Sequence, residues 1–186
     1  MDTANQILMT GIVSGGSGIV GVVVGFCADR WLRAKGGERV FVSDWKISYR
    51  GRGASGTPVD VSPAEAEFVQ FFFTADLFNT RDEPTGLRDV CVEFVGGGHT
   101  RLSVTPGDAD TLKIEAMRED ITDVKIVNLP PKHWKHLHLR RNVWGDDVAN
   151  VLAAEHVYLS VTDPAGKRHR YLVADLPRNS LTFAGR

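Results

Sequence analysis

The clearest structural signal in this chain is Phe68-Val69-Gln70-Phe71-Phe72-Phe73-Thr74-Ala75-Asp76-Leu77-Phe78. Its odd-numbered positions from 69 to 77 are all apolar, whereas the even-numbered ones include Gln70, Thr74 and Asp76. Successive side chains of a β-strand point to opposite sides, so a period of two indicates a strand. The stretch is therefore predicted to be a strand with one face in a hydrophobic core.

Similar patterns continue on both sides of this strand. Val90, Val92 and Phe94 alternate with Cys91 and Glu93 and predict the next strand, after a polar turn segment at 79–86 and before a break at 96–98. Shorter strands are predicted at 40–49, 101–104, 112–117 and 124–129, an extended piece at 136–140, and a hairpin of 157–162 with 168–173 around a turn at 163–166. A short helix is expected from 146 or 147 to near 154, and residues 51–65 are expected to form a surface loop.

Seven to nine short strands joined by Gly, Pro, Asn and Asp turns indicate a mainly β fold, an antiparallel sandwich. The stretch from Ala75 to Phe94 looks like strands B and C of many bacterial immunoglobulin-like modules, although the Cys…Trp…Cys spacing of antibody domains is absent. In layout, the chain resembles uncharacterised bacterial proteins with one N-terminal helix and a small immunoglobulin-like β-sandwich. That resemblance covers about residues 40–175 and implies a fold but no activity or site.

The N-terminal region has a different character, because residues 7–27 contain no charged side chain. A helix of that length spans about 31 Å, which is close to the hydrocarbon thickness of a bilayer. The sequence therefore predicts a tail at 1–6, a single transmembrane α-helix at 7–28, a juxtamembrane linker at 29–39, a β-sandwich at 40–176 and a C-terminal tail at 177–186. Arg30, Arg33, Lys35 and Arg39 follow the apolar run and none precedes it, which predicts an outside N-terminus and a cytoplasmic β domain.

Two other interpretations of this region are weaker. A cleaved signal peptide has positive charge before its apolar run, and here there is none. Gly16, Gly18 and Gly21 match the dinucleotide motif G-x-G-x-x-G, but the residues that follow lack the polar face of an amphipathic helix. The small residues instead gather on about a third of the helix surface and predict close packing with a membrane-protein partner or a second copy of the chain. They are Gly11, Ser14, Gly15, Gly18, Gly21 and Gly25.

Composition limits the function classes. The formal net charge of −1 argues against bulk nucleic-acid binding, which usually needs a basic excess. The two cysteines, Cys27 and Cys91, are interpreted as free thiols because one lies at the end of the apolar run. No catalytic motif is found, and no cofactor or small-molecule ligand is predicted.

Two groups of side chains in one segment could still carry a function. Zinc could bind His133, His136 and His138 if their ring nitrogens converged, but no nearby Cys completes a site, so a solvated strand face is the simpler interpretation. A basic group of Lys132, Lys135, Arg140 and Arg141 could contact anionic lipid or an acidic partner.

The sequence thus favours a membrane-anchored, non-catalytic binding or scaffold domain that engages membrane lipid and a protein partner or itself. The alternatives are a metal-binding or hydrolytic enzyme that uses the three histidines, and an envelope-binding module on the outer side of the membrane.

Overall fold

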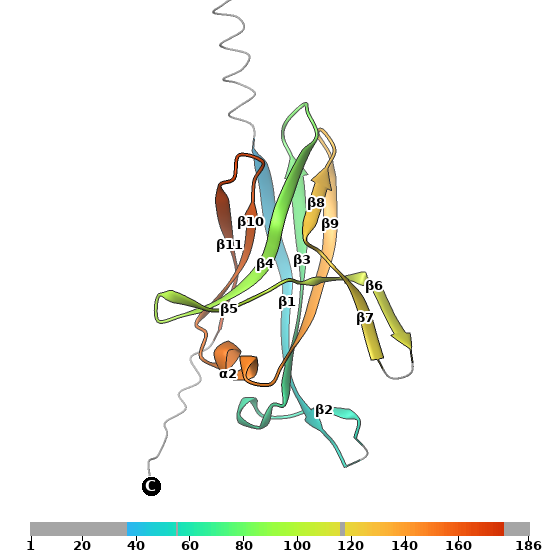
Figure 1. The fold of residues 1–186 in the computed structure, drawn as a ribbon, viewed down its shortest axis with the longest axis vertical. Helices are drawn as coiled ribbons and strands as arrows, with labels where there is room; N and C mark the ends of the chain where they lie inside the picture. The colour runs from blue at the N-terminus through green and yellow to red at the C-terminus, as the bar shows by residue number, and fades with distance from the viewer. Residues whose placement is uncertain (1–36, 55, 116–117, 177–186) are drawn as a thin grey trace, which may run out of the picture.

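The computed structural model describes residues 37–54, 56–115 and 118–176, which form two facing antiparallel sheets (Figure 1). The six-stranded sheet has the order β2-β1-β3-β9-β6-β7. Its strands are β1 (Glu38–Arg52), β2 (Pro58–Asp60), β3 (Phe68–Asn79), β6 (Gly107–Glu115), β7 (Arg118–Asp123) and β9 (Trp134–Trp144).

The second sheet has the order β11-β10-β4-β5, with β8 paired to the first part of β4. These strands are β4 (Thr85–Gly96), β5 (His99–Val104), β8 (Ile126–Leu129), β10 (His156–Thr162) and β11 (Arg168–Asp175). A 3-10 helix, η1 (Pro63–Glu65), and a short helix, α2 (Asp147–Leu152), lie at the end of the sandwich where β2 is found (Figure 1). The predicted mainly β, antiparallel architecture is confirmed.

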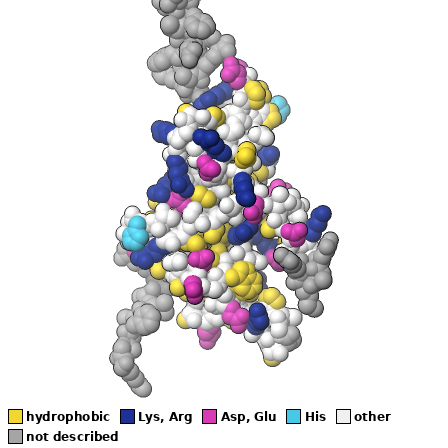
Figure 2. Space-filling model, viewed as in Figure 1, with side chains coloured by type: hydrophobic (Ala, Val, Ile, Leu, Met, Phe, Trp, Pro, Cys, Tyr) yellow, Lys and Arg dark blue, Asp and Glu magenta, His cyan; other side chains and the backbone are white. Residues whose placement is uncertain are grey.

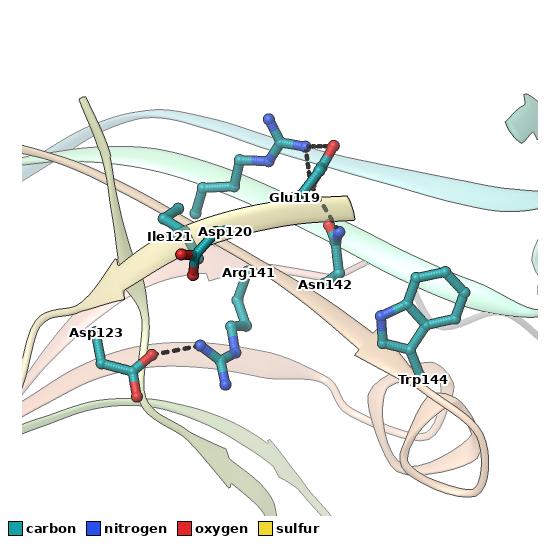
Figure 3. A pocket seen from close by; sticks show the side chains of 8 residues that line it. Glu119, Asp120, Ile121, Asp123, Arg141, Asn142 and Trp144 are labelled. Atoms are coloured by element: carbon teal, nitrogen blue, oxygen red, sulfur yellow. Dashed lines mark hydrogen bonds and ion pairs between the residues drawn. The ribbon is translucent and has the colours of Figure 1, made fainter. Parts of the chain in front are cut away.

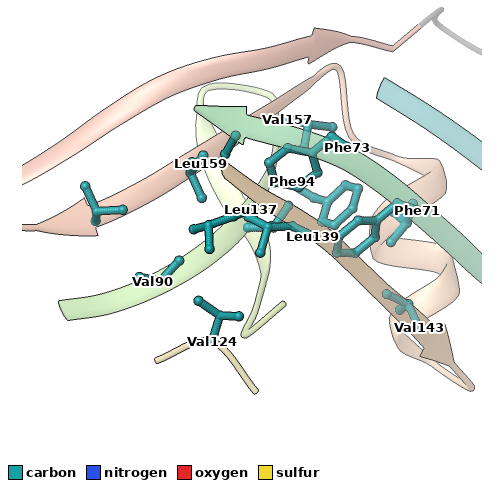
Figure 4. Close-up of a cluster of buried hydrophobic side chains, with 14 of the residues drawn as sticks. Phe71, Phe73, Val90, Phe94, Val124, Leu137, Leu139, Val143, Val157 and Leu159 are labelled. Carbon is teal, nitrogen blue, oxygen red and sulfur yellow. The ribbon is translucent and has the colours of Figure 1, made fainter. Parts of the chain in front are cut away.

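The core lies between the sheets and is built on β3. The five apolar odd-numbered positions of β3 are between 0 and 1% exposed, as their alternation predicts. Phe71 is one of these buried side chains (Figure 4), and its ring centroid is 5.8 Å from that of Trp45 and 5.7 Å from that of Phe94. Leu137, Leu139 and Val143 of β9 are buried on the same side, so the even-numbered positions of β9 face away from the core.

A β-bulge divides β1 into two halves. The pairing of β1 with β3 shifts between Ser43 and Lys46, and Asp44 has a positive φ of 57°. Such a bulge places two residues opposite one and reverses which positions face inward. Val40 and Val42 pack on the core before it, whereas Trp45, Ile47 and Tyr49 do so after it.

The second sheet carries a buried carboxylate on the face turned away from the core. Glu93 of β4 is 1% exposed and pairs with Arg168 at 2.6 Å and Arg170 at 2.7 Å, both from β11. Arg168 also donates from Nε to the hydroxyl of Ser160 at 2.6 Å. Figure 2 shows cations and acids side by side on this face. The arginines compensate the desolvation of the carboxylate, which would otherwise be costly.

Several predicted boundaries differ from the structure. The segment 124–129, predicted as one strand, is a connection followed by β8, and β7 before it was not predicted. The predicted loop 51–65 contains the end of β1, β2 and η1. The predicted helix is present as α2, and Asp146 occupies its N-cap without a side-chain capping bond.

The N-terminal predictions fall on residues that the structure does not describe. The tail at 1–6, the transmembrane helix at 7–28, most of the linker at 29–39, and the tail at 177–186 lie outside the described residues. Within 37–54, 56–115 and 118–176, no helix has the length and apolar character that a membrane span requires.

Candidate functional site

The main candidate is the face of the six-stranded sheet that points away from the core, called here the outer face. Its central strands, β3 and β9, pair along their whole length, from Phe68 opposite Trp144 to Phe78 opposite Trp134. Because the odd-numbered positions enter the core, the even-numbered ones form the outer face. On the paired parts of β3 and β9 these positions are Phe68, Gln70, Phe72, Thr74, Asp76, Phe78, Trp134, His136, His138, Arg140, Asn142 and Trp144.

A groove lies at the end of the outer face nearest β2, and we call it the outer-face groove. It has a volume of about 580 Å³. It is lined by Arg50, Pro58, Phe68, Gln70, Glu119, Arg140, Asn142 and Trp144. A neighbouring pocket of about 390 Å³ continues under β7 past Asp120, Ile121, Asp123 and Arg141 (Figure 3). The groove therefore runs between β2 and the hairpin of β6 and β7, which projects from the sandwich (Figure 1).

Polar contacts hold the β6–β7 hairpin against the groove. The guanidinium of Arg140 donates to both carboxylate oxygens of Glu119 at 2.7 Å each, and the amide of Asn142 donates to the same carboxylate at 3.1 Å. The Gln70 amide, turned so that its oxygen faces Arg140, accepts a hydrogen bond of 2.7 Å. Both of these bonds to Glu119 come from one guanidinium nitrogen, Nη2, and such short, charge-assisted hydrogen bonds are stronger than neutral ones. The polar wall of the groove is therefore preorganised.

The other wall of the groove is aromatic. Trp144 stacks on Phe68 with ring centroids 3.9 Å apart, and it remains half exposed. Phe68 itself is buried and cannot move aside easily. A supported, half-exposed indole beside fixed donors and acceptors is the residue pattern of a binding anchor.

The four predicted basic residues do not form one continuous group. Arg140 lies on the outer face with Glu119, whereas the next residue, Arg141, points to the opposite side and pairs with Asp123 at 2.6 Å. Lys132 and Lys135 lie at the other end of β9 and are exposed. A contact of these residues with an anionic surface stays a prediction.

The three predicted histidines contact three different partners. His136 bonds to Asp76, His138 bonds to Asp110 at 2.9 Å, and Nδ1 of His133 is 2.8 Å from a backbone oxygen. The Asp110 carboxylate raises the pKa of His138 above its usual value, first through the hydrogen bond and then through its charge. Across the described ranges, no three His, Cys, Asp or Glu side chains are grouped to hold a metal ion.

A second aromatic group lies at the opposite end of the outer face. Trp134 stacks on Phe78 with centroids 4.8 Å apart and contacts Phe41 at 5.8 Å, and both Trp134 and Phe41 are about half exposed. The sequence analysis did not single out this group or the groove residues Trp144, Glu119 and Asn142. The outward positions of β9 carry both aromatic and charged side chains, and Arg141 interrupts its inward ones. The strand therefore shows no clear alternation that would have drawn attention to the tryptophans at its ends, and no local signal links Glu119 to Arg140.

Comparisons with known proteins agree with this architecture. The family model described as the YopI Ig-like domain matches residues 38–173, from the start of β1 to β11, which is well over half of the chain. The chain belongs to this family. The SPbeta prophage-derived uncharacterized protein YopI of Bacillus subtilis (strain 168) is 24% identical over 170 residues, covering 88% of this chain and 96% of that protein. The predicted immunoglobulin-like sandwich is thereby confirmed.

Two solved structures are also similar to this chain. One is an uncharacterized β-sandwich protein from Clostridium difficile 630, with 15% identity, a TM-score of 0.35, and coverage of 74% of this chain and 85% of that one. The other is the putative ApaA protein from Bordetella pertussis, with 11% identity, a TM-score of 0.33, and coverage of 75% and 91%.

Proposed function

We propose that this YopI-family chain is a membrane-anchored, non-catalytic binding module that holds a protein partner in its outer-face groove. The observation that carries the proposal is the groove itself. It combines a half-exposed indole, supported from behind by a buried ring, with a fixed guanidinium, carboxylate and amide. Tryptophan and arginine are the residues that most often dominate binding energy at protein interfaces.

The form of the groove favours a segment of a protein over a small molecule. It is open between β2 and the β6–β7 hairpin, and it continues into the neighbouring pocket under β7. A small ligand is normally enclosed over most of its surface, whereas an open groove with both polar and aromatic walls suits a loop or an extended peptide. Another protein or a second copy of this chain supplies that segment, and the crosslinking experiment below distinguishes the two.

The anchor is proposed from the sequence of residues 7–28 and from the cations that follow it. The small-residue face that includes Gly15 and Gly18 would let this helix pack closely against another one. Replacing Gly18 with Ile should remove crosslinked dimers if the helices self-associate. An unchanged dimer yield would eliminate helix self-association and leave the groove proposal intact.

A photo-crosslinking experiment tests the groove. A photoreactive phenylalanine is placed in the full chain at Trp144 and, as the matched control, at Leu172, since the two side chains are 51% and 52% exposed on different sheets. In native membranes, we expect an adduct of one defined mass from position 144 and none from 172. Mass spectrometry then identifies the partner or a second copy of the chain.

A variant of Arg140 shows whether the adduct depends on the groove. Arg140→Ala removes the guanidinium that orients Glu119, and we expect it to reduce the adduct at position 144 several-fold. Equal crosslinking from positions 144 and 172, or an adduct that Arg140→Ala leaves unchanged, would refute the groove as the binding site. Protease digestion of intact cells tests separately on which side of the membrane the β domain lies. Cleavage of the β domain from outside would refute the cytoplasmic orientation and favour an envelope-binding module.

A further inference from the structure

The N-terminal segment joins the sandwich at one particular end, which we call the Gly37 end. It comprises Gly37, the loop 80–84 between β3 and β4, and the turn 130–133 before β9. The hydroxyl of Thr80 donates to the carbonyl oxygen of Gly37 at 2.6 Å, and Lys132 Nζ donates to the carbonyl oxygen of Thr80 at 2.6 Å. The first described residue of the chain is therefore tied to a cation of the turn before β9.

This end is held together by a buried asparagine. Asn79 is fully buried, and its amide nitrogen donates to the carbonyl oxygens of Glu83 at 2.8 Å, Leu129 at 3.2 Å and Pro130 at 3.1 Å. Its side-chain oxygen accepts from the backbone of Arg81 at 2.9 Å. One side chain thus bonds both loops of the Gly37 end, so their relative positions are fixed.

The length of the linker limits how far this end can lie from a membrane. If the span ends at residue 28, nine residues lead to Gly37, which is at most about 32 Å of extended chain and about 14 Å if they are helical. The opposite end of β9, with Trp144, lies about 33 Å farther along the strand. The Gly37 end is therefore the part of the sandwich that an anchor would bring nearest to lipid.

The side chains at this end are those that favour a membrane interface. Trp134, Phe78 and Phe41 form an aromatic cluster in which Trp134 is 51% and Phe41 is 52% exposed. Tryptophan is enriched at the level of lipid head groups, where its ring is partly buried and its N–H stays hydrated. An aromatic cluster left half exposed in this way is the kind of surface that suits contact with a lipid interface.

The Gly37 end carries charges of both signs, so the aromatic side chains and the lysines would contribute differently to membrane contact. Lys132 and Lys135 are exposed there, but Asp82 lies 3.5 Å from Lys132 and offsets part of its charge. The aromatic cluster can therefore supply contact with any bilayer, whereas the lysines add a preference for anionic head groups.

We infer that the Gly37 end docks on the bilayer surface, with Trp134 in the head-group region and Lys132 and Lys135 over anionic lipid. The inference rests on the proposed membrane anchor. In this orientation the outer-face groove lies at the far end of the same sheet face and stays accessible to a partner.

Quenching by brominated lipid tests this orientation. The full chain, which has four tryptophans, is reconstituted in phosphatidylglycerol vesicles with brominated acyl chains, alongside Trp134→Phe and the matched control Trp144→Phe. Trp134 and Trp144 lie on the same sheet face and are both 51% exposed, so the two variants compare indoles of equal exposure at opposite ends of β9. We expect Trp134→Phe to lower the quenched amplitude by roughly half, because Trp31 and Trp134 would be the two interfacial indoles, and Trp144→Phe to leave it unchanged.

The outcomes separate docking from anchoring. If the chain floats with the vesicles and the two variants are quenched equally, docking is refuted and the anchor stands. If the chain does not float with the vesicles, the anchor fails and docking fails with it.

The double variant Lys132→Gln and Lys135→Gln should reduce Trp134 quenching in phosphatidylglycerol vesicles but not in phosphatidylcholine vesicles. Equal quenching of this variant and the parent in phosphatidylglycerol would refute the role of the lysines.

Discussion

Replacing Phe71 with Ala tests the core of the sandwich directly. The Phe71 side chain is fully buried, and its ring centroid lies within 6.3 Å of those of Trp45, Phe73 and Phe94. Truncation removes this apolar surface from the core and leaves a cavity that the surrounding rings, fixed on three different strands, cannot fill. Phe to Ala changes at such sites cost about 3–5 kcal/mol, and we expect about 4 kcal/mol here.

The next residue provides the matched control. Phe72 has the same side chain on the same strand but points to the outer face, where it is half buried and its ring lies 6.2 Å from that of His138. Its removal opens no cavity between the sheets. We therefore expect Phe72→Ala to lower the free energy of unfolding by only about 1 kcal/mol.

Thermal unfolding of the full chain in detergent micelles, followed by near-UV circular dichroism, measures both changes. At about 2–4 °C per kcal/mol for a domain of this size, Phe71→Ala should lower the Tm by about 8–16 °C and Phe72→Ala by about 2–4 °C. Equal losses, or a larger loss for Phe72→Ala, would mean that the strand is displaced by one residue and that the assignment of its two faces is wrong.

Three further predictions concern single positions. A Cβ added at Gly96 would lie 2.3 Å from a backbone carbonyl oxygen after α2, so Gly96→Ala should lower the free energy of unfolding, measured by urea denaturation, by about 2 kcal/mol. In the control Gly37→Ala the added Cβ meets nothing within 4 Å, and the same measurement should show little change. Glu93→Gln should cost about 2 kcal/mol, less than a fully buried ion pair, because its two arginines are half exposed and can turn to water; no loss in urea denaturation would contradict this. Because Asp110 raises the pKa of His138 in the folded state, the stabilisation from this pair is complete below the unfolded pKa and is lost as pH rises through the folded one. An NMR titration should show that Asp110→Asn lowers the pKa of His138, and an unchanged pKa would exclude this pair as the cause.

The fold was predictable where burial alone sets the pattern. The alternation in β3 is visible in the sequence because one face of that strand is packed against the other sheet along its entire length. The final hairpin was predictable for a second reason, since its turn has a glycine with positive φ, Gly166, which donates to the carbonyl oxygen of Asp163 at 3.0 Å. β7 was missed because it pairs with β6 in a projecting hairpin that buries little, so its sequence has few apolar positions.

The candidate site was less predictable, because its contacts join distant parts of the chain. The histidines appeared to form one group in the sequence, but His136 and His138 each find an aspartate 60 and 28 positions away. Arg140 finds Glu119 in the same way, 21 positions away. Proximity along a strand shows which side chains share a face, but their partners depend on which strands become neighbours.

The bulge in β1 makes the length of this strand as important as its composition. Ser43 pairs with Thr74 and Lys46 with Phe72, so Asp44 and Trp45 together lie opposite Phe73. Removing Asp44 would leave a continuous ladder in which every other pair with β3 is kept, and Val40, Val42 and Trp45 would still face the core. The same deletion among residues 46–49 would instead shift one part of the strand against β3 and turn its apolar side chains toward water. When YopI-family sequences are aligned, a gap at Asp44 is therefore expected to preserve the packing of this strand, whereas a gap a few residues later is not.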